Sequence, residues 1–106
     1  MLGFASYGPF RAFAAYQYTV EHSLYVAANH RWHGLGKVLL KELIERARRQ
    51  QYHVLVGGID SANAASIALH LGFGFKHVAT MPEVGFKFNR WLDLCFYQLI
   101  LDTPRK

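Results

Sequence analysis

The chain has 106 residues, of which 52% are hydrophobic and 18% are charged, a balance that is typical of a folded globular protein and excludes a disordered one. A chain of this length can build one small core but not two, so we expect a single domain over residues 1–106. The formal net charge of +5 favours an anionic partner, but the basic residues are scattered, which argues against nucleic acid.

Several site classes are excluded or disfavoured. No apolar run reaches the roughly 18–20 residues of a bilayer span, and the first residues lack the charged region of a signal peptide. A single cysteine, Cys95, allows no disulfide within the chain and reads as a small buried hydrophobe. The pair His30 and His33 has no Cys or carboxylate cluster to complete a metal site. We therefore expect a cytoplasmic protein with no metal, membrane or nucleic-acid partner.

Two strands are expected in the first quarter of the chain, where aromatic, small apolar and β-branched residues dominate. The first strand covers 2–7 and ends at the turn signal Gly8-Pro9, and the second, longer strand covers 16–26. This arrangement predicts a hairpin with a long loop.

A long helix is expected over 36–50, after a polar, glycine-containing turn. Its apolar residues recur three and four apart and form one face. Glu42 and Arg46, and Glu45 and Arg49, lie four apart on the polar side, in the order that stabilises a helix.

The second half of the chain reads as three strands, one short helix and connecting segments. We expect strands at 52–56 (ending at Gly57-Gly58), 75–81 and 91–101, a helix at 64–71 with Asp60, Ser61 or Asn63 as its N-cap, a loop at 82–89 and a frayed tail at 103–106. The strand–helix–strand order in the middle implies a parallel pair, whereas the ends of the chain look antiparallel. The predicted fold class is therefore α+β, or mixed α/β.

The segment before the long helix, Arg31-Trp32-His33-Gly34-Leu35-Gly36, has the composition of an anion-binding loop. The first N–H groups of a helix lack internal partners, glycine lets a phosphate approach the backbone, and Arg31 adds a cationic fork. The segment fits no Walker loop, because Gly36-Lys37 is followed by Val38, and no dinucleotide loop, because Leu39 replaces the third glycine. The same residues also suit an ordinary turn with an exposed arginine, and the pattern alone does not choose.

Arg31-x-x-Gly34-x-Gly36 between a strand and a helix resembles the signature Arg/Gln-x-x-Gly-x-Gly/Ala of the GNAT superfamily of acyltransferases. Further segments are similar to its phosphinothricin and methionine sulfoximine acetyltransferase branch and occur in the expected order at 18–26, 63–70, 73–75 and 84–93. Several motifs in register are more specific than one loop.

The resemblance implies the C-terminal portion of a GNAT acyl-CoA N-acyltransferase fold, with about five strands in a mixed sheet and two helices. In the family the sheet is V-splayed and carries helices on both faces. The resemblance further implies direct acetyl transfer from acetyl-CoA to the amine of a small amino-acid-like molecule of the phosphinothricin or methionine sulfoximine type, by an enzyme that forms dimers.

Carried onto this sequence, the resemblance places Glu21 beside the acceptor amine, where a carboxylate accepts a proton, and His70 near the CoA sulfur, as a candidate acid for the leaving thiolate. A strand N–H near Tyr25 or Val26 would stabilise the oxyanion. The implied cofactor-binding residues are Leu24, Tyr25 and Val26 along the pantetheine, Arg31, Trp32, His33, Gly34, Leu35, Gly36 and Lys37 at the pyrophosphate, and Asn63 and Ser66 on the second helix.

Each of these residues also has an interpretation in which its role is purely structural. Glu21 on a strand also suits a solvent-facing position, with His22 pointing to the opposite face. His70 also suits a satisfied core histidine. Arg90 and Trp91 suit either an interface or the acceptor pocket.

The chain departs from the family in two ways. It begins at what resembles the third strand, so we expect an exposed apolar sheet face, an unpaired strand edge and self-association into a homodimer or larger homo-oligomer. Gln17 stands where the branch often has an arginine, which leaves the acceptor open. An inactive CoA-binding fragment or interaction module is thus the alternative to an active enzyme, and a basic nucleic-acid-binding protein is the third hypothesis.

Overall fold

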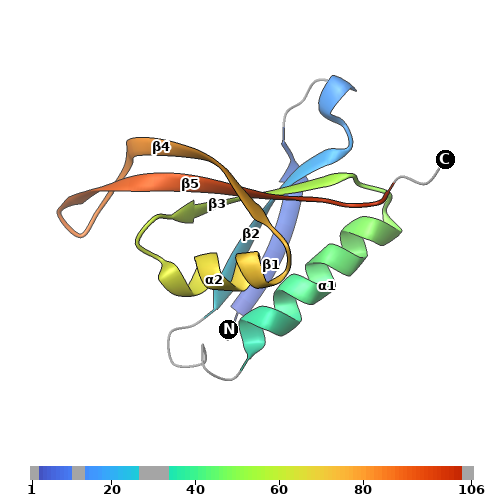
Figure 1. Cartoon of the computed structure of the whole chain (residues 1–106), viewed down its shortest axis with the longest axis horizontal. Coiled ribbons are helices and arrows are strands. Elements are labelled where there is room, and N and C mark those ends of the chain that lie inside the picture. The colour runs from blue at the N-terminus through green and yellow to red at the C-terminus, as the bar shows by residue number, and fades with distance from the viewer. Residues whose placement is uncertain (1–2, 11–13, 27–33, 104–106) are drawn as a thin grey trace.

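The computed structural model describes residues 3–10, 14–26 and 34–103 and contains one mixed sheet with two α-helices on it (Figure 1). This confirms the predicted α+β class and the number of strands. The elements are β1 (Gly3–Pro9), a 3-10 turn (Ala14–Tyr16), β2 (Thr19–Val26), α1 (Leu35–Arg49), β3 (Val54–Asp60), α2 (Ala64–Gly72), β4 (Lys76–Lys87) and β5 (Arg90–Ile100).

The sheet has the strand order β1-β2-β3-β5-β4. The predicted hairpin of β1 and β2 is antiparallel, and β2 pairs with β3 in parallel across the crossover through α1, as expected. The remaining pairs, β3 with β5 and β5 with β4, are antiparallel. In the described part of the chain, β1 therefore has a strand partner on one side only, in agreement with the expected unpaired edge.

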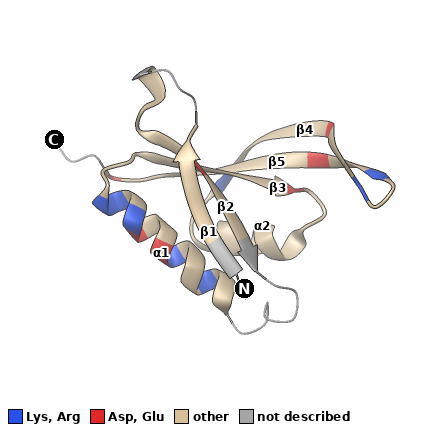
Figure 2. Ribbon diagram, turned by 180° about the vertical axis from the view of Figure 1, so that it is seen from behind, with Lys and Arg blue, Asp and Glu red and all other residues tan. Residues whose placement is uncertain are grey.

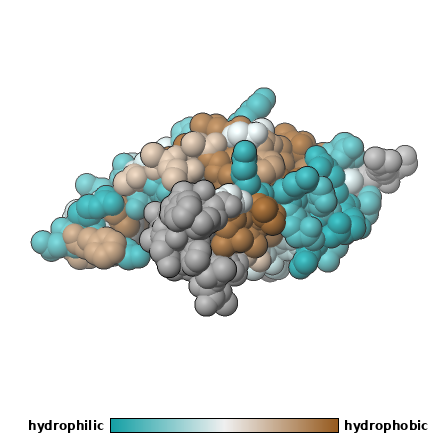
Figure 3. Space-filling model, turned by 90° about the horizontal axis from the view of Figure 1, so that it is seen from below, coloured by the Kyte–Doolittle hydropathy of each residue, from teal (hydrophilic) through white to brown (hydrophobic). Residues whose placement is uncertain are grey.

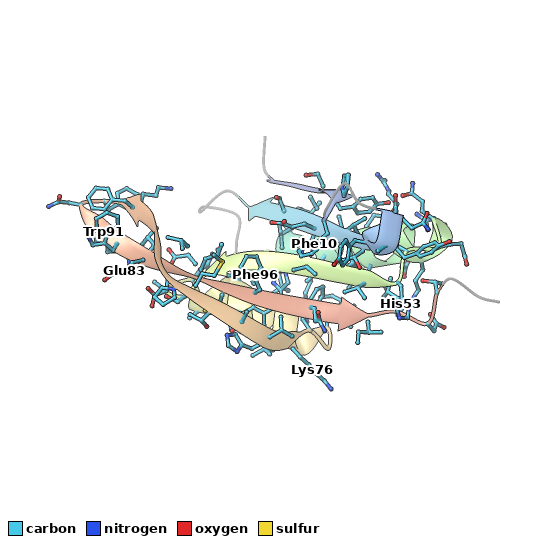
Figure 4. The ribbon with its side chains drawn as sticks, turned by 90° about the horizontal axis from the view of Figure 1, so that it is seen from above. Phe10, His53, Lys76, Glu83, Trp91 and Phe96 are labelled. Atoms are coloured by element: carbon cyan, nitrogen blue, oxygen red, sulfur yellow. The ribbon has the colours of Figure 1, made fainter. Side chains whose placement is uncertain are left out.

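Both helices lie on the same side of the sheet (Figure 1). The apolar stripe of α1 buries Leu40, Leu43, Ile44 and Ala47 in one core cluster with Val20 of β2 and, after α2, Phe75. The implied helices on both faces are thus not found among the described residues, because α1 and α2 bury their apolar sides in this one core. Figure 4 shows the opposite, open face, with the half-buried Phe96 near its middle and Trp91 at the tip of the β4–β5 hairpin.

The expected loop at 82–89 is wrong for most of its length, because β4 continues to Lys87 and the hairpin turns at Phe88 and Asn89 alone. Both turn residues have positive φ, 53° and 59°, as in the tight turns that match the twist of two strands. A register shift between Met81 and Gly85 lets the strand pass Pro82 without a continuous ladder.

Four element boundaries also differ from the predictions. β3 continues through Gly57-Gly58, and β1 includes the expected turn at Gly8-Pro9. The second strand starts at Thr19, because the preceding residues form the 3-10 turn. Thr103 is not frayed but buried, and its hydroxyl donates to the carbonyl of Tyr52. Glycine and proline therefore mark a turn only where the chain around them is not paired with a neighbouring strand.

The surface is uneven in polarity. Figure 3, seen from the helix side, shows polar surface over α1 beside apolar surface near the centre, and Figure 2 shows the run of Lys and Arg along α1. Glu42 of α1 contacts both Arg46, at 3.9 Å, and Arg49, at 3.1 Å. Arg49 therefore pairs with Glu42, one turn earlier in the helix than the expected partner Glu45.

Large apolar side chains are exposed at the hairpin tip, where Phe86, Phe88 and Trp91 are 58%, 83% and 63% exposed. Cys95 is buried, as predicted.

Within the described residues, no helix combines the length and apolar character that crossing a membrane requires.

Candidate active site

The sheet opens between β2 and β3, and we call this opening the fork. The parallel ladder joins Thr19–His22 to Val54–Gly57 and then stops. Beyond it, as far as the structure describes the chain, β2 pairs only with β1 and β3 only with β5, so the two strands diverge (Figure 1). The facing edges of Ser23–Val26 and Gly58–Asp60 thus lack a strand partner among the described residues, which suits the binding of an extended ligand by backbone hydrogen bonds.

Leu24, Tyr25 and Val26, the residues expected along the pantetheine, lie on this diverging end of β2. Their ladder with β1 occupies one edge of the strand and leaves the other facing the fork. The prediction for these three residues thus falls on a segment with free backbone hydrogen-bonding capacity.

Gly34 precedes α1 in the left-handed conformation, with φ 76°, and gives the helix no side-chain cap. The first turn of α1 also contains no acidic residue. The N–H groups of this turn, which includes Leu35, Gly36 and the exposed Lys37, are therefore available to an anion, and the helix dipole favours one there. Arg31, Trp32 and His33 lie outside the described residues, so their part in the anion site stays a prediction.

Asn63 caps α2, as one of the three expected N-cap candidates, and its Oδ1 accepts a hydrogen bond from the N–H of Ser66 at 3.1 Å. This bond fixes the side-chain amide and turns its NH₂ group away from the helix. Asn63 is exposed and Ser66 is half-buried, so both are compatible with the predicted contact to a pantetheine arm.

Glu21 and His22 point to opposite faces of β2, as predicted. Glu21 is exposed on the open face and pairs in register with Val56, one residue before the ladder ends. His22, the last residue of the ladder, is only 4% exposed and lies on the helix side. The carboxylate therefore sits at the mouth of the fork, while the imidazole lies beneath it.

His22 meets His70 of α2 in a buried imidazole pair, which we call the histidine pair. The two Nε2 atoms are 3.0 Å apart, and the rings stack with centroids 5.2 Å apart. His70 Nδ1 lies 2.8 Å from the carbonyl oxygen of Ser66, one turn earlier in the helix. The ring of Phe75 packs against both imidazoles, with its centroid 5.4 Å from that of His22 and 4.9 Å from that of His70.

The surroundings of the pair favour uncharged rings. Burial, and to a lesser extent the neighbouring His70, together lower the pKa of His22 to about 4. Burial also lowers the pKa of His70, against the opposing effect of its hydrogen bond to the carbonyl of Ser66. At neutral pH both imidazoles are therefore neutral.

Sequence reasoning named His70 but gave His22 no role, although it placed His22 on the opposite face from Glu21. Gly57 was not predicted to matter either, and its importance comes from its contact with the His22 ring. A Cβ on Gly57 would lie 2.7 Å from Cε1 and 2.8 Å from Nε2 of His22. A histidine that alternates with a carboxylate at the end of a strand is a weak signal, and nothing local links it to a helix 48 residues later.

We expect Gly57→Ala to lower the free energy of unfolding by about 1–3 kcal/mol, because the new methyl group displaces the His22 ring from a closely packed site. Urea denaturation measures the change. Gly72→Ala is the matched control, since a Cβ at Gly72 meets no atom within 4 Å, and it should leave stability equal or slightly higher. Equal stability of the two variants would contradict the tight packing of Gly57 on His22.

Known proteins resemble the chain in both sequence and structure. Residues 1–75, which include the fork and both helices, match the model of the acetyltransferase (GNAT) family. A Salmonella typhimurium L-methionine sulfoximine/L-methionine sulfone acetyltransferase is 57% identical over 100 residues, which cover 94% of this chain and 58% of that protein.

Two solved structures have the same fold. An N-acetyltransferase from Staphylococcus aureus superposes with a TM-score of 0.89 at 54% identity, over 93% of this chain and 60% of that one. A GNAT superfamily phosphinothricin acetyltransferase from Sinorhizobium meliloti, in complex with acetyl-CoA, gives 0.88 at 39% identity, over 94% and 54%. The chain thus spans somewhat more than half the length of these relatives, and with a family match over most of its residues it belongs to the acetyltransferase (GNAT) family.

Proposed function

We propose that this chain carries the cofactor site and the proton acceptor of an acetyl-CoA-dependent N-acetyltransferase whose acceptor is the amine of a small amino-acid-like molecule. The fork with Glu21 at its mouth carries this proposal, because it combines a free strand edge for a thioester ligand with a carboxylate within reach of the reacting end. The 57% identity to an acetyltransferase named for methionine sulfoximine and methionine sulfone supports that acceptor class.

Acetyl-CoA is the proposed donor. The uncapped first turn of α1 suits the pyrophosphate, with Arg31, Trp32, His33 and Lys37 contributing from the loop and the helix. The free edge of Leu24–Val26 suits the amides of the pantetheine, and Asn63 and Ser66 at the start of α2 are its further proposed contacts. The phosphinothricin acetyltransferase that was solved with acetyl-CoA shares this fold and supports the assignment.

The proposed reaction is direct transfer. The acceptor ammonium first gives one proton to Glu21, through a water, and becomes a free amine. The amine nitrogen then attacks the thioester carbonyl, and strand N–H groups near Tyr25 and Val26 stabilise the oxyanion. The carbon–sulfur bond breaks, the nitrogen loses its second proton, and the leaving thiolate is protonated. The products are the N-acetyl compound and CoA, and Glu21 releases its proton to solvent.

His70 is the proposed acid that gives a proton to the leaving thiolate. Both of its ring nitrogens already have partners, Nδ1 at the Ser66 carbonyl and Nε2 at His22. His70 therefore exchanges a proton only as one member of the histidine pair.

Self-association into a homodimer is part of the proposal. The exposed aromatic side chains of the hairpin tip, Phe86, Phe88 and Trp91, support it, because apolar groups of this size are usually covered in an assembly.

Thiol release tests the activity. The purified chain is mixed with acetyl-CoA and with methionine sulfoximine, methionine sulfone or phosphinothricin, and free CoA is followed with a thiol reagent. We expect release that depends on the acceptor. A chain that acetyl-CoA protects against thermal unfolding, but that releases no thiol at high protein concentration, would instead be an inactive CoA-binding module.

A further inference from the structure

The hydrogen bond to Ser66 determines where His70 carries its proton. A backbone carbonyl only accepts, so the Nδ1 atom that lies 2.8 Å from it must bear the hydrogen. A neutral imidazole has one N–H, so His70 Nε2 then presents a lone pair.

The 3.0 Å contact in turn determines the tautomer of His22. Two lone pairs at this distance would repel each other, so His22 Nε2 must be the donor. His22 Nδ1 is then a bare acceptor, and it is the buried side-chain atom without a hydrogen-bond partner in the described part of the chain. The orphaned nitrogen thus follows from the chain of bonds that begins at Ser66.

We propose that His22 is a positioning residue for His70, which it holds by an Nε2–H···Nε2 bond as the Nδ1–H tautomer, in a fixed ring plane at the base of the fork. Three contacts prevent the alternatives. Gly57 leaves room for the His22 ring and for little else, Phe75 packs on both rings, and the Ser66 carbonyl holds the far side of His70. Rotation of either ring would break a bond and meet packed atoms.

This arrangement limits how His70 exchanges a proton, an inference that rests on the proposed function. The Nε2 atom of His70 is occupied by the bond from His22, so a proton can leave His70 only from Nδ1. The Ser66 carbonyl takes no proton, so this N–H must first leave the carbonyl before it can reach another acceptor.

Histidine NMR tests the pairing without any substrate. In the whole chain labelled with ¹⁵N-histidine at neutral pH, long-range proton–nitrogen correlations should identify His70 as the Nδ1–H tautomer and His22 as the Nε2–H tautomer. A protonated Nε2 on His70, or a charged ring in the pair, would overturn the proposal. If the tautomers are as stated but the chain releases no thiol, the proposed function fails and the pairing stands.

Two substitutions at His22 test its effect on turnover. His22→Leu removes the donor, and we expect kcat to fall about 10-fold with the KM for acetyl-CoA unchanged, because His70 is no longer held in place. His22→Gln keeps an N–H donor of similar reach and should restore most of the loss. Thermal melting confirms that both variants fold, and His77→Gln, at an exposed histidine of β4, is the control. Equal kcat values for His22→Leu and the parent chain, or equal losses in both His22 variants, would contradict positioning.

Discussion

Glu21→Gln is expected to lower kcat by about 100-fold or more, because general base catalysis typically contributes about 10²–10⁴-fold and the amide accepts no proton. Glutamine keeps the size and the exposed position of the side chain, so the fork and the backbone of β2 should be unchanged. Thiol release with saturating acetyl-CoA and acceptor measures kcat, and titration calorimetry measures binding of acetyl-CoA, which should stay the same.

Glu45→Gln is the matched control, since Glu45 is an exposed carboxylate on α1, on the other side of the sheet from Glu21. It should leave both quantities unchanged. Turnover by Glu21→Gln at the parent rate would remove Glu21 as the proton acceptor, and loss of acetyl-CoA binding would mean that the carboxylate supports the cofactor site.

The parts of the fold that depend on local periodicity were predictable. The three-and-four spacing that predicted a helix over 36–50 places Leu40, Leu43 and Ile44 in the core. The strand–helix–strand order predicted the parallel pair of β2 and β3, because a crossover of this kind has few alternatives.

The errors arose where local signals met long-range pairing. Gly57-Gly58 looked like the end of a strand, yet β3 continues because β5 pairs with it on one side. Gly57 is there for a side-chain reason, to leave room for His22. Pro82 looked like a loop, yet a register shift keeps β4 going along β5. For Gly57-Gly58 the deciding contacts come from residues far away in the sequence, whereas for Pro82 they come from the other strand of the same hairpin.

The site residues proposed from motifs stay predictions, and the contacts between them could not be predicted. Glu21, Gly34 and Asn63 occupy positions that suit the roles expected of them, at the fork mouth and at two helix starts. The role of His70 depends on a contact with His22, 48 residues earlier, and on which nitrogen bears a proton. No sequence pattern encodes either feature, because both arise from the packing of α2 against β2.

The histidine pair should also make the protein acid-sensitive. His22 has an ordinary pKa of 6.5 in the unfolded chain and about 4 in the folded one, so between these values the unfolded state binds a proton that the folded state does not. The part of the free energy of unfolding that comes from keeping His22 neutral is fully present above pH 6.5 and is lost as the pH falls toward 4. The pKa shift of His22 corresponds to about 3 kcal/mol of this free energy. The lowered pKa of His70 adds to this loss with the same sign.

Urea denaturation between pH 7.5 and pH 4.5 measures this loss as the change in the free energy of unfolding. His22→Leu and His22→Gln both remove the titrating ring, so the free energy of unfolding should fall less steeply with pH in both than in the parent chain. The two variants differ in packing and hydrogen bonding, so they should differ in stability at pH 7.5 while sharing the flatter pH dependence. A slope as steep as that of the parent chain in both variants would show that acid unfolding comes from carboxylates or other histidines, and that the pair is not held neutral by its burial. Because burial is what keeps both rings uncharged, the packing that positions His70 at neutral pH is also what should make the fold fail in acid.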